Sequence, residues 1–524
     1  MVQGRVLVVA GSDPSGGAGL EADQKVLAAH QCYAMTATTA LTVQNTKGVL
    51  GVHVVPAEFV GRQIDAVVED IGVDVVKTGM LGSVETIDVL SDMIEKHNLT
   101  TVVVDPVMVS TSGARLLPHE AIKHLSDRLF SRTTLLTPNV PEAKLLLAEN
   151  GIAEQRLKHN VRGVDELEAL AQTIRDRLGP RWVLVKGGHV PLRAADMTAA
   201  AAGDEDKDKD AADKIVVVDV LVGPEGEVVK VQSPFQPSTS THGTGCSLAS
   251  AISAHLAKGQ DVPTAVRAAC RYVAAGIRTA PRLGGGNGPL NHFHSSYTLP
   301  FSPGYFVEYL LERPDVQPVW KEFVHHPFVM ALGNGTLPLD SFKGYIIQDY
   351  LFLVQFARAN SLAAYKAKKI TDIQRSNEIV SHIVREMDLH INYCKGFGIS
   401  EQEIQATPEL QACTAYTRYV LDIGQSEDLL ALQIALAPCL LGYGAVAQML
   451  AAHPATVRDQ QANTYWPWIE TYGAADYAEA VRLGSDLIEK RIRDCSPARI
   501  EELVKIFIHG TRMEIGFWEM FPSK

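Results

Sequence analysis

The chain has 524 residues and a formal net charge of −12 at pH 7, with 46% hydrophobic and 21% charged residues. This length exceeds what one hydrophobic core usually serves, so about two or three globular domains are predicted. The acidic balance, without clustered Lys and Arg, argues against a nucleic-acid surface. No apolar run is expected to cross a bilayer, and the N-terminus carries no signal-peptide pattern. We therefore expect a cytoplasmic protein that binds neither nucleic acid nor membranes.

The cysteines are scattered, odd in number and free of any C-x-x-C spacing, which argues against both a disulfide framework and a zinc site. Most are expected to be buried as small hydrophobic residues. A reactive cysteine must therefore be argued from its own surroundings. The seven are Cys32, Cys246, Cys270, Cys394, Cys413, Cys439 and Cys495.

Short β-branched runs alternate with helical stretches over the first 290 residues or so. Each run ends in Gly, Pro, Asp or Asn, as buried parallel strands do where the chain turns. This pattern predicts an α/β sandwich with ligands at the carboxyl ends of its strands. The runs are "RVLVVAG", "VDVVKTG", "TVVVDPV", "TLLTPN" and "WVLVKGG".

A Gly- and Pro-rich segment, residues 281–304, breaks this pattern and marks the expected domain boundary. Beyond it the apolar residues follow a helical period, and no strand is predicted. The second half is therefore expected to be an all-α domain rich in aromatic residues. A low-complexity insert at residues 194–213 is expected to form a surface loop.

The first Gly-rich loop, "VVAGSDPSGGAGLEADQK", lacks both G-x-G-x-x-G and G-K-[ST], so alone it fits a tight strand-to-helix turn equally well. Together with six later motifs, however, it resembles the hydroxymethylpyrimidine and hydroxymethylpyrimidine-phosphate kinase family, of α/β ribokinase-like fold. The resemblance runs from Arg5 to Phe293 and implies ATP and Mg²⁺. The motifs are "QNTKGV", "KTGMLGS", "DPVMVSTSG", "TPNVPEA", "VKGGH" and "STHGTGCSLASA".

The resemblance implies that five residues surround a pyrimidine substrate. Asp23 and the Gln44 amide are expected to read a ring nitrogen and an exocyclic amine, whereas Met80 and Val107 cover a ring face. The pyrimidine is also expected to sit under Gly11. For Gln44 the alternative is an ordinary polar residue at a strand end.

On the ATP side, Asn139 and Glu142 resemble the motif that organises Mg²⁺ and its waters. Alone, Glu142 equally suits a carboxylate at a helix start. Lys186 resembles a phosphate-contacting lysine, although lysines at strand ends are commonly only solvated.

Cys246 ends the Gly-rich turn, where many ribokinase-like enzymes place an Asp that removes the acceptor's proton. A thiol at a helix N-terminus is expected to have a lowered pKa and to act as a weak base. Gly243, Thr244 and Gly245 are expected to offer N–H groups to the transferred phosphoryl group. We expect the cysteine to tolerate a phosphate monoester that a carboxylate would repel. The alternative is that Cys246 only packs at a crowded turn.

In the second half, "LQIALAPCLLGYGAVAQML" places Pro438 inside a helical run, beside Cys439. A cysteine on an apolar helix usually belongs to the core. Four further stretches, however, occur in the order of thiaminase II, the TenA family of haem-oxygenase-like helical bundles, from Val319 to the C-terminus. They are "HHPFVMALGNGTLPLDSFKGYIIQDY", "AYTRYV", "PWIETYG" and "MEIGFW".

This second resemblance implies that Cys439 adds to the pyrimidine ring, that Glu514 shuttles the ring-nitrogen proton, and that Asp349 binds the aminopyrimidine edge. Phe352 stands where the bacterial enzymes often have a tyrosine. The remaining pocket residues are expected to be Tyr416, Tyr443, Tyr472 and Phe517.

The two halves together resemble fused thiamine-biosynthesis proteins of fungi. The predicted domains are residues 1–295 and 305–524, with a linker at 296–304, in a homo-oligomer. The expected activities are two successive phosphorylations of 4-amino-5-hydroxymethyl-2-methylpyrimidine, and hydrolysis of thiamine or aminopyrimidine breakdown products. The alternative is a pyridoxine-type vitamin kinase fused to a non-catalytic regulatory or oligomerisation domain.

Overall fold

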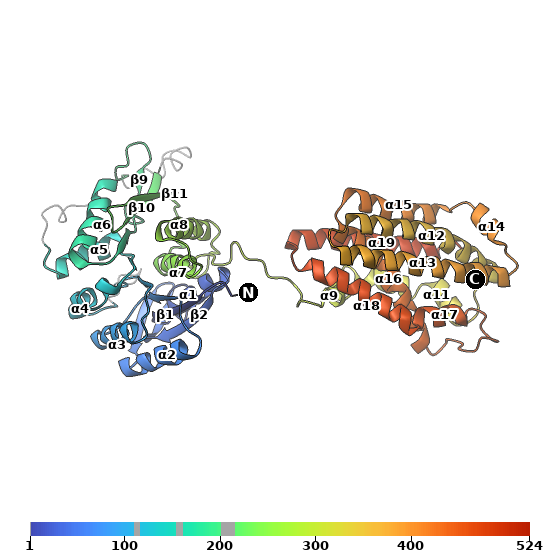
Figure 1. The fold of residues 1–524 in the computed structure, drawn as a ribbon, viewed down its shortest axis with the longest axis horizontal. Helices are drawn as coiled ribbons and strands as arrows, with labels where there is room; N and C mark the ends of the chain where they lie inside the picture. Colours follow the sequence, from blue (N-terminus) through green and yellow to red (C-terminus); the bar gives the residue numbers. More distant parts are fainter. Residues whose placement is uncertain (1, 109–115, 153–160, 201–214, 524) are drawn as a thin grey trace. The chain divides into compact units, whose positions relative to one another are not determined.

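The computed structural model describes residues 2–108, 116–152, 161–200 and 215–523, and it divides into two compact units (Figure 1). The first unit is Met1–Ser296 and the second is Tyr297–Lys524. Most of the low-complexity insert, residues 201–213, lies outside the described residues, as do residues 109–113 of the "DPVMVSTSG" motif.

The first unit is built on a mixed sheet in the order β11-β10-β8-β7-β6-β5-β1-β2, with β9 paired to β10. All five predicted strands are confirmed as β1, β5, β6, β7 and β8, which pair in parallel; β2, which was not predicted, pairs in parallel with β1. The sequence analysis missed the antiparallel edge that β10 and β11 add. The bounds are β1 Arg5–Ala10, β2 Tyr33–Thr38, β5 Val75–Thr78, β6 Val102–Val104, β7 Leu135–Leu136, β8 Trp182–Val185, β9 Leu192–Arg193, β10 Ile215–Val222 and β11 Val228–Pro234.

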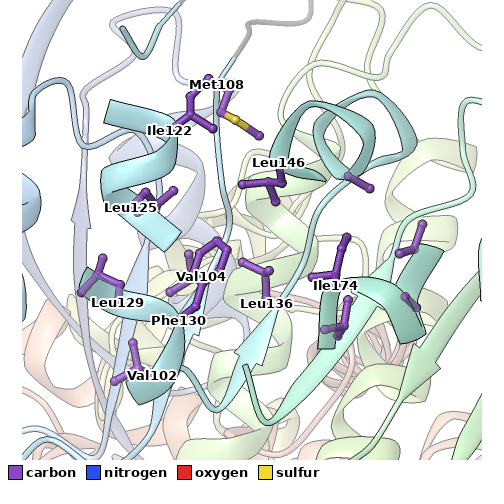
Figure 2. Close-up of a cluster of buried hydrophobic side chains, with 14 of the residues drawn as sticks. Val102, Val104, Met108, Ile122, Leu125, Leu129, Phe130, Leu136, Leu146 and Ile174 are labelled. Atoms are coloured by element: carbon purple, nitrogen blue, oxygen red, sulfur yellow. The ribbon is translucent and has the colours of Figure 1, made fainter. Parts of the chain in front are cut away.

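Helices cover both faces of this sheet, as strands buried on both faces require. In β1, Leu7 and Val9 pack among the residues of α2 to α6, whereas Val6 and Val8 pack towards α1 and α7. Figure 2 shows part of the first core, where Val102 and Val104 of β6 lie among helical side chains. The bounds are α1 Gly19–Ala29, α2 Ala57–Asp70, α3 Val84–Lys96, α4 His119–Leu129, α5 Val140–Glu149, α6 Val164–Leu178, α7 Thr244–Ala257 and α8 Val262–Arg278; a short 3₁₀ turn spans Phe130–Arg132.

A separate two-stranded hairpin, β3 Ala40–Asn45 and β4 Gly48–Val54, carries Gln44. The Gly-rich stretch that was expected to open the domain boundary packs on its tip. Gly286 N–H donates to Thr46 Oγ1 at 3.2 Å, and Asn287 N–H donates to Thr46 O at 2.9 Å. A Cβ at Gly286 would collide with Thr46 O, so glycine is needed for this close approach. Residues 281–296 therefore belong to the first unit.

The second unit is helical throughout its described residues, and this confirms the all-α prediction. The bounds are α9 Phe306–Glu312, α10 Gln317–Val324, α11 Pro327–Gly333, α12 Leu339–Lys366, α13 Ile370–Gly396, α14 Glu401–Ala406, α15 Gln411–Ser426, α16 Leu429–Ala452, α17 Trp466–Gly473, α18 Ala475–Ile492 and α19 Pro497–Trp518. α16 lies in the core and contains Pro438. Gly510 of α19 lies against this proline, since a Cβ at position 510 would sit 3.0 Å from Pro438 Cγ.

α16 corrects the expectation that no apolar run is long enough to span a bilayer. It has 24 residues and a mean hydropathy of 1.9 in its most apolar window, enough to cross a membrane by length and composition. However, 72% of that window is buried inside the protein. A helix that is hydrophobic on all sides is also what the centre of a helical domain requires.

Candidate active sites

A pocket of about 580 Å³ opens at the carboxyl ends of the parallel strands in the first unit. It lies where α/β folds commonly bind ligands. Its apolar end is lined by Val217, Phe235, Val273 and Ile277, which the sequence analysis did not identify. Of the residues predicted for the kinase site, the pocket brings together Gly11, Gln44, Met80, Val107, Asn139, Glu142, Lys186, Gly243, Thr244, Gly245 and Cys246.

Asp23 is the predicted residue that does not line this pocket. Its side chain is 0% exposed and accepts hydrogen bonds from Lys77 Nζ at 2.8 Å and Ser250 Oγ at 2.7 Å. The structure therefore does not bring Asp23 to the pocket with the other predicted residues. Lys77, which does line the pocket, was missed. The signal was a lysine within the otherwise apolar strand β5.

Lys77 and Asp23 form an ion pair in which both side chains are fully buried. Burial raises the pKa of Asp23, although Lys77 opposes that effect. Burial alone would lower the pKa of Lys77, but Asp23, Cys246 and Asp105 outweigh it and raise that pKa. The ammonium group is thus retained next to the thiol of Cys246.

Cys246 is the third residue of α7, at the position predicted, but its pKa is raised to about 11 rather than lowered. Burial is the main cause; Asp23 and Asp105 add to it, whereas Lys77 opposes it. The thiol is therefore protonated at neutral pH. The helix N-terminus does not overcome the loss of solvation.

The turn before Cys246 depends on Gly243, which caps α7 with φ +77°. A Cβ there would collide with Gly17 O. Thr244 N–H donates to Thr241 O at 3.3 Å, so it is already used, contrary to the prediction. The next two amides of the first turn, those of Gly245 and Cys246, have no carbonyl partner within a helix. They are the donors that the turn offers to an anion.

A second charged group lies close to the same turn, since a Cβ at Gly245 would sit 3.1 Å from Lys186 Nζ and 3.7 Å from Asp105 Oδ2. Asp105 Oδ1 accepts from Lys186 Nζ at 2.8 Å and from Thr137 Oγ1 at 3.2 Å. Lys186 Nζ lies 3.9 Å from Glu142 Oε2. Asp105 was missed, although a polar residue directly after a buried strand was a visible signal.

Glu142 lies at the start of α5, as the alternative interpretation of this residue predicted. Its Oε2 accepts from Asn139 N–H at 2.8 Å, and Asn139 Oδ1 accepts from Glu142 N–H at 2.9 Å, which forms a capping box. It also lines the pocket, so the two interpretations are compatible. Burial, opposed by Lys186 and assisted by Asp105, raises the pKa of Glu142 to about 7.

A third group, also missed, joins the first Gly-rich loop to the turn before α7. Asp13 is buried and accepts four hydrogen bonds: from Ser15 N–H at 2.9 Å, Ser15 Oγ at 2.7 Å, Ala18 N–H at 2.9 Å and His242 Nε2 at 2.8 Å. His242 Nε2 also lies 3.3 Å from Gln44 Nε2. Burial works to raise the pKa of Asp13, but the bonds from His242 and Ser15 outweigh it and lower that pKa.

In the second unit, Cys439 and Glu514 lie on two packed helices, α16 and α19. Glu514 Oε1 accepts from Tyr416 OH at 2.8 Å. Burial is the main cause that raises the pKa of Glu514 to about 8, with Asp349 adding to it. Burial, assisted by Glu514 and Asp349, raises the pKa of Cys439 well above its usual value. A proton donor and a protonated thiol therefore share one buried environment.

Asp349 on α12 is held by residues that the sequence analysis missed. Its Oδ2 accepts from His390 Nε2 at 2.8 Å and from Tyr345 OH at 3.3 Å. Burial would lower the pKa of His390, but Asp349 and Glu386 raise it to about 9. Glu386 in turn accepts from Tyr472 OH at 2.8 Å. The i,i+4 pair of Glu386 and His390 on one helix was the available signal.

Aromatic rings surround the buried cluster that contains Cys439, Glu514 and Asp349. Tyr443 and Tyr472 have ring centroids 5.0 Å apart. Phe352, the residue that departs from the bacterial pattern, stacks on Tyr416 at 5.1 Å and meets Phe517 edge-on at 5.7 Å. All the residues predicted for this second site thus lie on α12, α15, α16, α17 and α19 around one buried cluster.

Comparisons with known proteins find a family match for each half of the chain. Residues 13–291 match the family described as phosphomethylpyrimidine kinase, and residues 313–523 match the TENA/THI-4/PQQC family. The chain is 40% identical to "Putative hydroxymethylpyrimidine/phosphomethylpyrimidine kinase 2" of Schizosaccharomyces pombe, over 98% of this chain and 90% of that protein. It is 33% identical to "Hydroxymethylpyrimidine/phosphomethylpyrimidine kinase THI20" of Saccharomyces cerevisiae, over 98% and 94%.

Among solved structures, the phosphomethylpyrimidine kinase of Clostridium difficile 630 is 34% identical, with a TM-score of 0.40, over 51% of this chain and 97% of that one. The family matches and the full-length relatives establish the membership directly. The chain belongs to the phosphomethylpyrimidine kinase family and carries a second domain of the TENA/THI-4/PQQC family.

Proposed function

We propose that the first unit phosphorylates 4-amino-5-hydroxymethyl-2-methylpyrimidine twice with ATP, and that the second unit hydrolyses thiamine or aminopyrimidine breakdown products to supply that pyrimidine. The observation that carries the proposal is one pocket of the first unit, at the carboxyl ends of the parallel strands. It joins the Gln44 amide, the free amides of Gly245 and Cys246, and an apolar end suited to a purine.

In the kinase reaction, the Gly245 and Cys246 amides stabilise charge on the transferred phosphoryl group. Lys186, held by Asp105, neutralises the phosphates of ATP. Only the thiolate of Cys246 can accept the alcohol proton, and Lys77 beside it stabilises this minor form; the thiolate becomes the neutral thiol as the alcohol oxygen bonds to the phosphoryl group. In the second phosphorylation the acceptor is already anionic, and a neutral thiol does not repel it.

The carboxylates of Asp105 and Glu142 both line the pocket, and oxygen donors of this kind suit Mg²⁺. These two residues would hold the metal ion, which would neutralise phosphate charge. Asn139 Oδ1 is engaged with Glu142 N–H, so it acts by holding the helix start.

In the hydrolase, Glu514 donates its proton to a ring nitrogen and, as a carboxylate, takes the proton of the Cys439 thiol, whose sulfur adds to the ring. The bond from the methylene carbon to the leaving group then breaks, water adds to that carbon, and the Cys439 thiol is released. Asp349, which His390 Nε2 holds at 2.8 Å, accepts from the exocyclic amine. Tyr416 holds Glu514.

The decisive experiment measures ATP consumption by the full chain with the hydroxymethylpyrimidine, with its monophosphate and with pyridoxine. It also measures pyrimidine release from thiamine and from aminopyrimidine products. We expect phosphorylation of both pyrimidines to exceed that of pyridoxine. Preference for pyridoxine, together with no hydrolysis of either substrate, would support the alternative of a vitamin kinase with a non-catalytic partner domain.

We further propose a homo-oligomer in the cytoplasm with domains at residues 1–295 and 305–524. The compact units that end and begin at Ser296 and Tyr297 support this division. Separate expression of the two segments tests it, because each should fold and keep its own activity.

A further inference from the structure

The Gln44 amide is positioned between two groups whose hydrogen-bonding roles are fixed by other partners. Its Nε2 lies 3.3 Å from His242 Nε2, and its Oε1 lies 3.3 Å from Thr42 Oγ1. Half a turn of the amide exchanges its oxygen and nitrogen without moving any other atom. The surrounding hydrogen bonds decide which of the two orientations is stable.

On one side, His242 Nε2 acts as a donor. It lies 2.8 Å from Asp13 Oδ2, and an ionised carboxylate only accepts. The other three bonds to Asp13 come from donors as well, which keeps this carboxylate ionised. His242 Nε2 therefore donates whether the ring is neutral or charged, and an NH₂ group facing it would be a second donor.

On the other side, Thr42 has one hydroxyl proton, and its Oγ1 lies 2.9 Å from Ser12 O. A backbone carbonyl only accepts, so the proton of Thr42 goes to Ser12. What Thr42 then offers Gln44 is a lone pair. An amide oxygen facing that lone pair would leave two acceptors together.

Both mismatches disappear when the amide turns by half a turn, and the two arguments are independent. We propose that Asp13, His242 and Thr42 hold Gln44 with its oxygen towards His242 and its NH₂ towards Thr42, and thereby fix which way round an aminopyrimidine edge binds. Asp13 and His242 are positioning residues in this arrangement. The inference rests on the proposed function of the first unit.

The orientation of the Gln44 amide also determines where the hydroxymethyl group of the substrate lies. The amide oxygen can accept from an exocyclic amine, while the remaining amide N–H donates to the adjacent ring nitrogen. The amine then lies on the His242 side. The hydroxymethyl group is on the neighbouring ring carbon, so it also lies on that side. His242 directly precedes Gly243, so the alcohol is directed to the turn that carries the phosphoryl donors.

The opposite amide orientation would place the hydroxymethyl group towards Thr42, away from this turn. The backbone of His242 is fixed as well, since its N–H donates to Gly288 O at 3.1 Å. Asp13, His242 and the Gly-rich segment thus act together on one amide.

The test compares the 4-amino substrate with its 4-oxo analogue, 5-hydroxymethyl-2-methylpyrimidin-4-one, which presents the reverse donor and acceptor order on the same edge. In the wild-type chain, kcat/KM should favour the amino form by about 10⁴-fold, because the analogue leaves buried polar groups unpaired. In His242→Phe the amide is free to turn, and this ratio should fall by at least about tenfold. His242→Gln keeps an N–H donor and should retain most of the ratio.

His294→Phe is the matched control, because His294 lies outside this pocket. The ratio of kcat/KM for the two substrates in this variant should equal that of the wild type. If His242→Phe lowers kcat/KM for both substrates by the same factor, His242 has only a structural role and the inference is overturned. If the wild-type chain phosphorylates neither substrate, the proposed function itself fails. The two failures are therefore distinguishable.

Discussion

Lys77 Nζ and Asp23 Oδ2 form a 2.8 Å ion pair, fully buried beneath the kinase pocket and next to Cys246. Removal of one partner from such a pair typically costs about 3–5 kcal/mol, because an uncompensated charge stays buried. Lys77→Met should therefore lower the free energy of unfolding of the first unit by about this amount and also abolish phosphorylation. Chemical denaturation and the ATP-consumption assay measure the two effects.

The double variant Lys77→Met with Asp23→Leu separates stability from catalysis. Two apolar side chains should restore most of the lost stability, since neither charge remains. Phosphorylation should remain lost, because Lys77 no longer stabilises the Cys246 thiolate. Recovery of activity along with stability would mean that Lys77 has no part in the reaction.

Cys246→Asp should preserve more of the first phosphorylation than of the second. A carboxylate can accept the alcohol proton, but it repels a monophosphate acceptor that is already anionic. The measurement is kcat/KM for the pyrimidine and for its monophosphate. Equal losses in both would favour a packing role for Cys246.

The sequence predicted most of the fold because its signals were local. Five apolar runs that end in turn residues became the parallel strands of the first unit. The hairpin of β3 and β4 was missed because it exposes the apolar side chains of Leu41, Val43 and Leu50, whereas a half-buried strand usually buries its apolar face. The Gly-rich stretch near residue 286 resembled a linker, since only its tertiary contact with Thr46 shows why it needs glycine.

Site residues that lie within a recognisable motif were predicted. Site residues that are defined only by pairing with a distant residue were missed. Asp23 belongs to a recognisable stretch, yet its partner Lys77 lies 54 positions along the chain. His390 and Asp349 are likewise brought together only by the packing of α12 and α13. The raised pKa of Cys246 also follows from burial, which a helix N-terminus in the sequence does not reveal.

Hydrolysis by the second unit should depend on the protonation of Glu514. Because its pKa is raised to about 8, the carboxyl is protonated at neutral pH and becomes ionised as the pH rises through that value. We expect kcat/KM for hydrolysis to fall above about pH 8. Glu514→Gln should be severely impaired at every pH, without this decline. The same shift predicts that the stability contributed by Glu514 decreases between about pH 4.5 and 8, since the folded state holds the proton more tightly.

The two activities should be separable by one substitution. Cys439→Ser keeps the shape of the side chain but replaces the thiol with a hydroxyl, a far weaker nucleophile, so hydrolysis should fall by about 10³-fold or more. Combination with Glu514→Gln should add little, since residues that act as a unit lose their effect together. Phosphorylation of added pyrimidine should stay near wild type, because its pocket lies wholly in the first unit. Cys495→Ser is the control, since Cys495 lies away from the Glu514 cluster and its replacement should leave both activities unchanged. Retention of most hydrolysis in Cys439→Ser, or loss of the kinase in a folded protein, would contradict two independent active sites.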